Sequence, residues 1–505
     1  MAGMTEEILD VLIVGAGLSG IGQAAYLQQR CPHKRYAIVE RRDAIGGTWD
    51  LFRYPGIRSD SDMHTLGYAF KPWVHERSIA NAPAILDYVR ETASERGIDR
   101  HIRYGRKVVR AAWSTADALW TVSLELSGGG SETIRARFLA MCSGYYSYDA
   151  GHAPHFQGQE DFTGQIVHPQ FWPEGLDYAG KRVVVIGSGA TAVTLVPEMA
   201  RTAGHVTMLQ RSPTYVISAP AADGIANRLR RVLPAGLAYR LTRWKNVLRQ
   251  QIFFQLARRK PDFVKRRLIK ATQDAVGDRC DVERHFTPRY NPWDQRLCLI
   301  PDGDLFEAIN SGTASVVTDT IERFTETGIA LSSGDVLPAD IVVTATGLKL
   351  EVGGGAELVV DGQPVHLGRT LNYKGTMFSG IPNLSSTFGY TNASWTLKAD
   401  LTAEYVCRLL NHMDATGFAI ATPVADDRDA IGEEPMLDFS SGYVQRAVDI
   451  LPKQGRIKPW RLNQNYFRDL VTLRHRSIAD GTLRFSNPPA AALAATPAAR
   501  LHAAE

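Results

Sequence analysis

A glycine-rich turn near the N-terminus has the residue types and spacing of a dinucleotide-binding loop. The apolar run Val11–Val14 leads directly into Gly15, Gly17 and Gly20, in the spacing G-x-G-x-x-G. Glycines let the backbone turn tightly and approach a pyrophosphate, whose charge the N-terminus of the following helix stabilises. Glu40 ends the next apolar run, twenty residues after Gly20, where a carboxylate can bind a ribose 2′-hydroxyl. The alternative is a tight strand–helix turn without a ligand.

A second loop of the same plan begins near residue 187. The apolar run Val183–Ile186 precedes Gly187 and Gly189, and Ala192 stands where the third glycine would be. A short apolar segment at 206–211 follows, as the second strand does in the first copy. The chain therefore contains two copies of one dinucleotide-binding plan.

The two copies differ at the end of their second strands. The first has Glu40, whereas the second has Arg211 followed by Ser212. A carboxylate repels a 2′-phosphate, but a guanidinium can bind one through paired hydrogen bonds. The first site is therefore predicted to bind FAD, and the second to bind NADPH in preference to NADH. The alternative for Arg211 is a solvated surface arginine.

Both loops need a supporting sheet, and the chain supplies its elements twice. Alternating apolar segments at 119–144 and 329–347 each predict a β-meander. We therefore expect an α/β fold with two Rossmann-like dinucleotide-binding domains and a helical insert. The predicted boundaries are 1–147 and 376–505 for a discontinuous FAD-binding domain, 148–215 and 301–375 for an NADPH-binding domain, and 216–300 for the insert.

Length and composition exclude several other classes of protein. The chain has 505 residues, enough for two or three domains, and a net charge of +4 that gives no reason to expect a nucleic-acid partner. Its five cysteines are scattered, which indicates a reducing compartment and neither a disulfide frame nor a metal site. No apolar run reaches the roughly 18 residues that span a bilayer, and the first ten residues are acidic. We expect a cytoplasmic protein.

The segment 228–270 interrupts the α/β pattern and is strongly basic. It contains fourteen Lys or Arg residues and one acidic residue, Asp262. Its large apolar residues recur at helical spacing, at Leu237, Leu241, Trp244, Leu248 and Ile252. We favour an amphipathic helical insert that packs its apolar face inward and exposes its charges to water. The alternative is weak peripheral association with a membrane surface.

A second chemically rich stretch follows Glu40. Gly47, Thr48 and Trp49 combine flexible backbone with an aromatic side chain, which suits contact with a flat cofactor. The pair Pro55–Gly56 then forces a turn that can present Asp60. The alternative is an ordinary loop carboxylate that caps a turn.

Two patterns in the chain resemble the signatures of Baeyer–Villiger monooxygenases, which are class B flavoprotein monooxygenases. One is F-x-G-x-x-x-H-x-x-x-W-P at 162–173, and the other is the G-G-x-W, Y-P-G and Asp spacing that ends at Asp60. By this resemblance Asp60 matches the active-site aspartate of the family. His168 belongs to the first pattern, and we interpret it as a structural residue of the crossing between the two domains.

The resemblance also assigns an arginine. The segment 291–298, N-P-W-D-Q-R-L-C, is similar to the one that carries the catalytic arginine, especially in the ethionamide-activating subgroup. Arg296 is then expected to stabilise an anionic C4a-peroxyflavin, with Asp60 holding its guanidinium. Gln295 replaces a lysine found in many relatives, so phosphate binding depends more on Arg211 and Ser212. The alternative for Arg296 is a purely structural ion pair.

The resemblance implies a function. We expect an FAD-containing, NADPH- and O₂-dependent Baeyer–Villiger monooxygenase that converts ketones to esters or lactones and also oxidises thioethers. One alternative is an N- or S-oxygenating flavin-containing monooxygenase; another is a peripheral flavin-binding protein that oxygenates nothing. A flavin disulfide reductase is excluded, because Trp49 occupies the first position of its cysteine pair and the next cysteine is Cys142.

Overall fold

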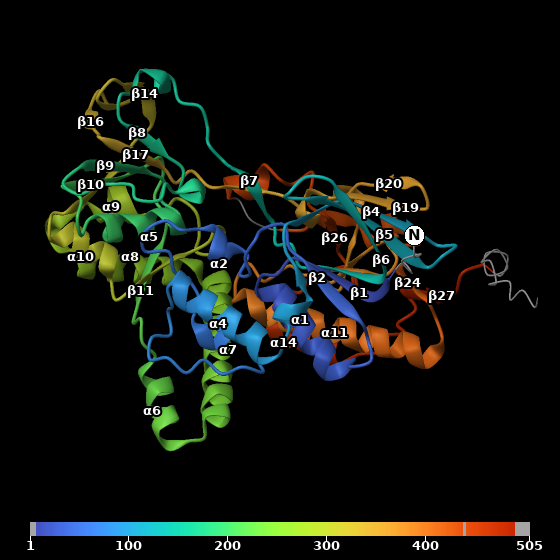
Figure 1. The fold of residues 1–505 in the computed structure, drawn as a ribbon. Coiled ribbons are helices and arrows are strands. Elements are labelled where there is room, and N and C mark those ends of the chain that lie inside the picture. The colour runs from blue at the N-terminus through green and yellow to red at the C-terminus, as the bar shows by residue number, and fades with distance from the viewer. Residues whose placement is uncertain (1–6, 438–440, 490–505) are drawn as a thin grey trace, which may run out of the picture.

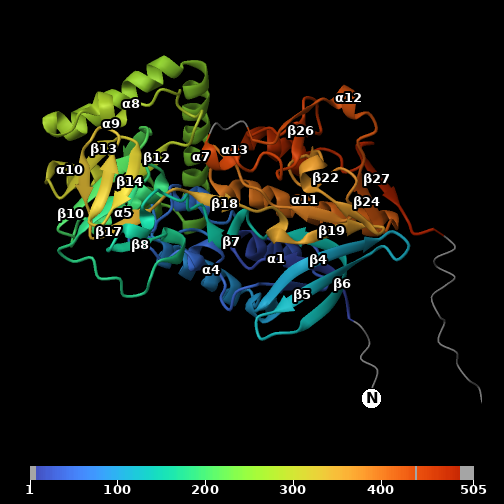
Figure 2. The same ribbon diagram turned by 90° about the horizontal axis from the view of Figure 1, so that it is seen from above.

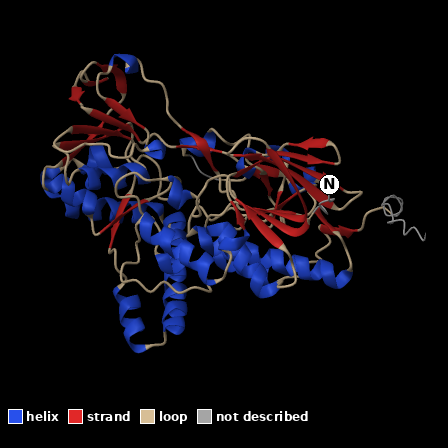
Figure 3. Cartoon of the chain, in the orientation of Figure 1, coloured by secondary structure: helices blue, strands red, loops and turns tan. Residues whose placement is uncertain are grey.

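The computed structural model describes residues 7–437 and 441–489. Two α/β units lie side by side, as Figures 1 and 2 show, and each is built on its own sheet. In the view of Figure 3 the sheets lie above and most of the helices below. The predicted α/β fold with two Rossmann-like units is confirmed.

The first unit is built on a nine-stranded sheet in the order β20-β19-β4-β5-β6-β1-β2-β3, with β23 paired to β6. The strand bounds are β1 (Ile8–Val14), β2 (Tyr36–Val39), β3 (Ile102–Arg103), β4 (Arg106–Ser114), β5 (Leu119–Leu126), β6 (Ser131–Met141), β19 (Glu357–Val360), β20 (Gln363–Val365) and β23 (Leu384–Ser386). Strand β1 is parallel to β2 and β6, whereas β4, β5 and β6 form an antiparallel meander, of which β5 and β6 lie in the predicted range 119–144.

Two long helices cover one face of this sheet. Helix α1 (Leu18–Arg30) begins at the first glycine loop, and α11 (Trp395–Thr416) returns late in the chain to pack beside it. Their apolar residues join α4 (Ala82–Glu95) in one buried cluster. This packing fixes the start of α1, and therefore the glycine loop, against the carboxyl ends of the parallel strands.

The second unit is a five-stranded parallel sheet in the order β13-β10-β9-β17-β8. The bounds are β8 (Gln165–Val167), β9 (Arg182–Ile186), β10 (His205–Gln210), β13 (Ala314–Thr318) and β17 (Ile341–Thr344), with α5 (Ala190–Met199) and α10 (Asp304–Asn310) packed on it. Strands β14 (Ile321–Thr325), β15 (Gly328–Leu331) and β16 (Val336–Pro338) form a separate three-stranded antiparallel sheet. The meander predicted at 329–347 is only partly correct, because its last strand is β17, which pairs in parallel with β8 and β9.

Two chain segments connect the units. Strand β7 (Tyr146–Gly151) leaves the first unit and pairs with β18 (Leu348–Leu350), which returns to it. Strands β19 and β20 follow β18 and belong to the first sheet, although the sequence placed 301–375 entirely in the second domain. We therefore propose that the chain re-enters the first unit near β18 and not at residue 376.

The remaining elements are short. Besides single-turn 3₁₀-helices, they are α2 (Thr48–Leu51), α3 (Met63–Leu66), α12 (Arg428–Ile431), α13 (Gly442–Gln445), α14 (Tyr466–Asp469), a π-helix at Leu470–His475, and the strands β21 (Asn372–Tyr373), β22 (Met377–Phe378), β24 (Ile420–Pro423), β25 (Glu433–Pro435), β26 (Lys453–Gly455) and β27 (Leu483–Ser486).

The insert is helical, as expected. It leaves the second unit at β11 (Val216–Ala219) and returns at β12 (Cys298–Pro301), and these two strands pair with each other. Between them lie α6 (Gly224–Val232), α7 (Ala235–Arg259), α8 (Pro261–Val276) and α9 (Val282–Phe286). Helix α6 and the start of α7 form a hairpin that projects from the body of the molecule (Figure 1).

The expectation that α7 packs its apolar face inward is wrong. The five large apolar residues at helical spacing are all exposed, by 46% to 58%. The face that packs against the first unit is mostly polar and includes Thr242, Arg243, Asn246 and Gln251.

The reason is a polar network between α7 and the first unit. Buried Arg243 forms a 3.0 Å ion pair with Asp400 of α11, and it donates to the carbonyl oxygens of His64 (2.9 Å) and Gly67 (2.7 Å). Burial works against its charge, but Tyr239 and Asp400 raise the pKa of Arg243 overall. Once these bonds form, the opposite, apolar face of α7 must point to solvent.

Across the described ranges, no helix combines the length and the apolar character that crossing a membrane would require.

Replacing Arg243 tests this network. R243M leaves Asp400 buried without its partner, so we expect the free energy of unfolding to fall by about 3–5 kcal/mol, measured by urea unfolding of the holoprotein. R240M, at an exposed arginine on the same helix, is the matched control and should change it by less than about 0.5 kcal/mol. Equal stability of the two variants would contradict the role of the network.

Candidate active site

A cavity of about 340 Å³ is lined by residues of both units. The first glycine loop, the loop around Asp60 and the start of α5 all contribute to its wall. A second cavity of about 120 Å³ shares Trp49, Asp60, Arg296 and Trp395 with the first. The two cavities therefore meet at Trp49, Asp60 and Arg296, which the sequence singled out for chemistry, and at Trp395.

The glycines of the first loop are required by close packing. Gly15 has φ of +104°, and a β-carbon there would lie 2.6 Å from the carbonyl oxygen of Cys142. One at Gly20 would overlap the carbonyl oxygen of Gly15. Gly17 lies against Gly47, where a β-carbon would be 3.1 Å from the Gly17 α-carbon. Gly15, Gly17 and Gly47 line the larger cavity, so this part of its wall is bare backbone, and Gly20 is buried.

Glu40 holds this loop and still has acceptor capacity. Its carboxylate accepts hydrogen bonds from the backbone amides of Ala16 (2.8 Å) and Arg42 (3.0 Å). Burial raises the pKa of Glu40. A carboxylate can accept about four hydrogen bonds, so two positions remain for a ribose. Together with the bare glycine wall, these donors and acceptors fit a nucleotide cofactor.

Asp60 and Arg296 form an ion pair in the wall of both cavities. Arg296 Nη2 lies 2.6 Å from Asp60 Oδ2, and the two side chains are 38% and 29% exposed. Asp60 is presented by the loop that follows Gly56, whose φ is +73°. Arg296 lies two residues before β12. The carboxylate of Asp60 raises the pKa of Arg296, against the opposing effect of burial.

Aromatic side chains surround this ion pair. The smaller cavity is lined by Trp49, Tyr145, Phe388, Trp395 and Tyr443. The rings of Tyr145 and Trp395 stack with centroids 5.2 Å apart, and the hydroxyl of Tyr145 lies 2.7 Å from that of Tyr146. The cavity is therefore mostly apolar around one ion pair, as organic-ligand sites with a few polar groups usually are.

Sequence reasoning missed Tyr145, Tyr146 and Phe388. The first two follow the carboxyl end of β6, and Phe388 follows that of β23. Ligands of open parallel sheets bind at those ends. That position was the available signal for these residues.

The second glycine loop has the same tight backbone. Gly187 has φ of +137°, and a β-carbon there would collide with the carbonyl oxygen of Ala345. Gly189 has open space around it, and Ala192 is fully buried in α5. The neighbouring Thr191 lines the larger cavity.

Arg211 and Ser212 are exposed at the end of β10, next to this loop. The hydroxyl of Ser188 donates to the carbonyl oxygen of Ser212 at 3.2 Å. Neither Arg211 nor Ser212 lines the larger cavity, whose wall includes Asp60 and Arg296. The second loop thus has an exposed guanidinium on its outer side and reaches the larger cavity through Thr191.

His168 lies where the two connecting segments meet. A β-carbon at Gly151 of β7 would overlap its ring. Its Nδ1 accepts from the amide of Gln170 at 3.2 Å, and the Gln170 side chain donates to the carbonyl oxygen of Ser147 at 2.8 Å. Burial lowers the pKa of His168. Its role as a structural residue of the crossing stays a prediction.

Comparison with known proteins identifies the family. A family model described as "Flavin-binding monooxygenase-like" matches residues 69–353, and one described as "NAD(P)-binding Rossmann-like domain" matches 13–76. The chain belongs to the flavin-binding monooxygenase-like family. The prediction of a flavin-dependent monooxygenase is thereby confirmed.

Similar curated proteins span nearly the whole chain. The FAD-containing monooxygenase EthA of Mycobacterium tuberculosis is 57% identical over 491 residues, covering 96% of this chain and 99% of that protein. The probable FAD-binding monooxygenase AlmA of Acinetobacter baylyi is 48% identical over 481 residues, covering 95% and 96%. The expected likeness to the ethionamide-activating subgroup is confirmed.

Solved structures share the fold. A steroid monooxygenase bound to NADP is 25% identical, with a TM-score of 0.70 over 83% of this chain and 88% of that one. A cyclohexanone monooxygenase has a TM-score of 0.72 at 20% identity, covering 83% and 90%, and supports the fold alone.

The glycine packing gives a test of the flavin site. G15A places a β-carbon against the carbonyl oxygen of Cys142, in the wall of the cofactor cavity. One such steric clash costs about 1–3 kcal/mol, so we expect the affinity for flavin to fall at least tenfold. The flavin-to-protein absorbance ratio of the purified protein measures it. G189A adds a β-carbon in open space and is the control that should keep its flavin. Full flavin content in a folded G15A variant would show that the loop does not hold the cofactor.

Proposed function

We propose that this protein is an FAD-containing, NADPH- and O₂-dependent Baeyer–Villiger monooxygenase that converts ketones to esters or lactones. The observation that carries the proposal is the 2.6 Å ion pair between Arg296 and Asp60, in the wall of an aromatic cavity that both units line.

The first unit has the residues to hold FAD. Gly15, Gly17 and the buried Gly20 provide the close backbone approach at the start of α1, and Glu40 provides an acceptor for the ribose. The segment Gly47–Trp49 also lines the cavity, to which it contributes backbone atoms and the indole of Trp49. The reduced cofactor, when bound, supplies electrons that activate O₂.

The second unit is the candidate NADPH site. Gly187, Gly189 and Ala192 shape the turn into α5, and Arg211 with Ser212 would bind the 2′-phosphate. A solved relative of this fold is bound to NADP. The start of α5 reaches the shared cavity through Thr191. A dinucleotide bound at this loop would therefore have its nicotinamide end on the side of the flavin site.

Arg296 has the position and charge of an electrostatic catalyst. Its guanidinium is protonated at every working pH, and the neighbouring carboxylate of Asp60 raises its pKa further. Asp60 fixes its orientation, so it needs no rearrangement when negative charge develops on a carbonyl oxygen in the cavity. The apolar aromatic wall lowers the local dielectric and strengthens that interaction.

Ketones suit this cavity because they are apolar molecules with one polar oxygen. Thioethers share the apolar character, and we include sulfoxidation as a secondary activity. An N- or S-oxygenating monooxygenase is the second candidate, since the matching family model covers flavin-binding monooxygenases generally. The fixed arginine beside the cavity favours the first, because it stabilises an anionic oxygen nucleophile.

Removing Arg296 separates the candidates. R296A should still consume NADPH but lose at least 100-fold in ester formation, the order expected for one lost transition-state donor. Product is scored by chromatography with a panel of linear, cyclic and aryl ketones. R296K keeps the charge without the planar guanidinium and should retain intermediate activity. Ester formation at the wild-type rate in R296A would overturn the assignment.

Arg211 tests the nicotinamide preference. R211A should weaken NADPH binding by roughly 10–100-fold, the range for a lost charge-assisted contact, and leave NADH nearly unaffected. The ratio of kcat/KM for the two cofactors measures this. R201A removes another exposed arginine of the second unit and is the control. An unchanged ratio in R211A would place the phosphate elsewhere.

A further inference from the structure

Helix α7 carries a continuous apolar stripe on its solvent side. The stripe consists of Leu237, Leu241, Trp244, Leu248 and Ile252, which are 46%, 46%, 46%, 51% and 58% exposed. At about 100° per residue these positions fall within an arc of about 80°, and at 1.5 Å per residue they extend over about 22 Å. Scattered exposed leucines are ordinary, but an aligned row of this length marks an interaction surface.

The stripe extends onto a second element. The indole of Trp244 stacks on the ring of Phe467, with centroids 6.0 Å apart and planes at 26°. Phe467 is 37% exposed, and Val471, one turn later, is 48% exposed. The apolar surface is therefore built by the insert and by the C-terminal part of the first unit together.

The fold fixes this surface in its exposed position. Arg243 and Asn246 on the opposite face bond to the first unit. Buried Gln251, near the edge of the stripe, accepts from the Asn465 side chain at 3.0 Å. Turning the stripe inward would leave a buried arginine and its aspartate without partners, which is strongly unfavourable. The exposure is therefore a stable property of the folded chain.

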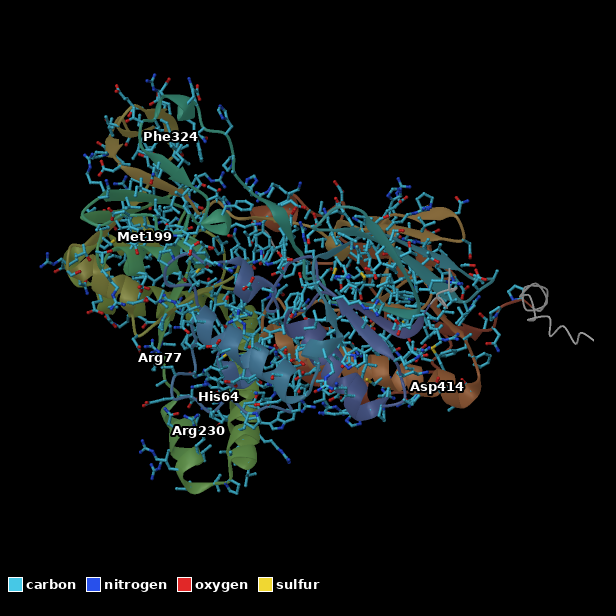
Figure 4. All side chains as sticks on the ribbon, in the orientation of Figure 1. His64, Arg77, Met199, Arg230, Phe324 and Asp414 are labelled. Atoms are coloured by element: carbon cyan, nitrogen blue, oxygen red, sulfur yellow. The ribbon has the colours of Figure 1, made fainter. Side chains whose placement is uncertain are left out.

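Positive charge surrounds the stripe. Arg240, Arg249 and Arg259 are exposed on α7 beside it. The segment 228–270 as a whole has fourteen basic residues against one acidic residue, whereas the rest of the chain is net negative. Figure 4 shows Arg230 on α6, at the end of the molecule where the hairpin projects, and His64 near the place where α7 meets the body.

We propose that the α6–α7 hairpin docks on the surface of an anionic lipid bilayer, with the stripe inserted at the headgroup level. An apolar face bordered by arginines is the pattern of helices that lie in a membrane interface. The basic border complements anionic headgroups. A second copy of this chain packed on the same face would bring two basic borders together, which opposes a two-fold dimer.

Docking would place the candidate active site close to the bilayer. The inward face of α7 contacts the segment 62–67, which directly follows Asp60. One helix diameter, about 10 Å, therefore separates the membrane-facing stripe from that segment. An apolar substrate dissolved in the bilayer would have a short path to the cavity. The docking proposal itself does not depend on which oxygenation the protein catalyses.

Sedimentation of the FAD-loaded full chain with vesicles tests the proposal. We expect binding to vesicles of equal parts phosphatidylglycerol and phosphatidylcholine, and much weaker binding to pure phosphatidylcholine. L241Q/L248Q should weaken it roughly tenfold or more, through lost apolar insertion. R240Q/R249Q should weaken it by about fivefold for each charge removed. Because all four side chains are exposed, turnover of a water-soluble ketone should stay unchanged in both variants.

V336Q is the matched control, since Val336 is 55% exposed on β16 of the other unit. It should bind anionic vesicles as the wild type does. Equal binding of L241Q/L248Q and V336Q would overturn the proposal, as would equal binding of the wild type to both vesicle types. Sedimentation velocity without lipid supplies the remaining outcome: a dimer that L241Q/L248Q abolishes, with no vesicle binding, would show that a second copy covers the stripe.

Discussion

A half-buried arginine must have a carboxylate beside it, and this requirement shapes the centre of the molecule. Arg296 comes from the end of the insert, and Asp60 comes from a loop of the first unit more than two hundred residues earlier. Both charges are partly removed from water in the aromatic cavity, so each one favours the presence of the other. Their pairing joins the segment that leads into β12 to a loop of the first unit.

The insert is attached to the first unit by a second pair of the same kind. Arg243 of α7 reaches Asp400 of α11, and a further ion pair joins Arg58 to Asp304 of the second unit. Such pairs contribute little net stability but strongly penalise other arrangements. The same bonds explain both the preformed cavity and the exposed stripe, since a helix anchored by its polar face has to leave its apolar face outside.

Much of this could be predicted from the sequence because it depends on local patterns. The glycine loops, Glu40 and the strand–helix alternation follow from short-range backbone requirements, and the pairing of Asp60 with Arg296 followed from the resemblance. The direction of the α7 stripe could not be predicted. Helical periodicity identifies which residues share a face, but only the long-range partner Asp400 determines which face is buried. That β19 and β20 join the first sheet depends likewise on strand pairing, which no local signal records.

The most direct test of this account is a double-mutant cycle on product formation. Ester formation is measured for the wild type, D60A, R296A and D60A/R296A, at saturating NADPH and ketone, with folding and flavin content verified for each. If the two residues act as one unit, the double variant is no slower than R296A alone. Additive losses, with the double variant slower by the product of the two single effects, would contradict the claim that Asp60 acts through Arg296.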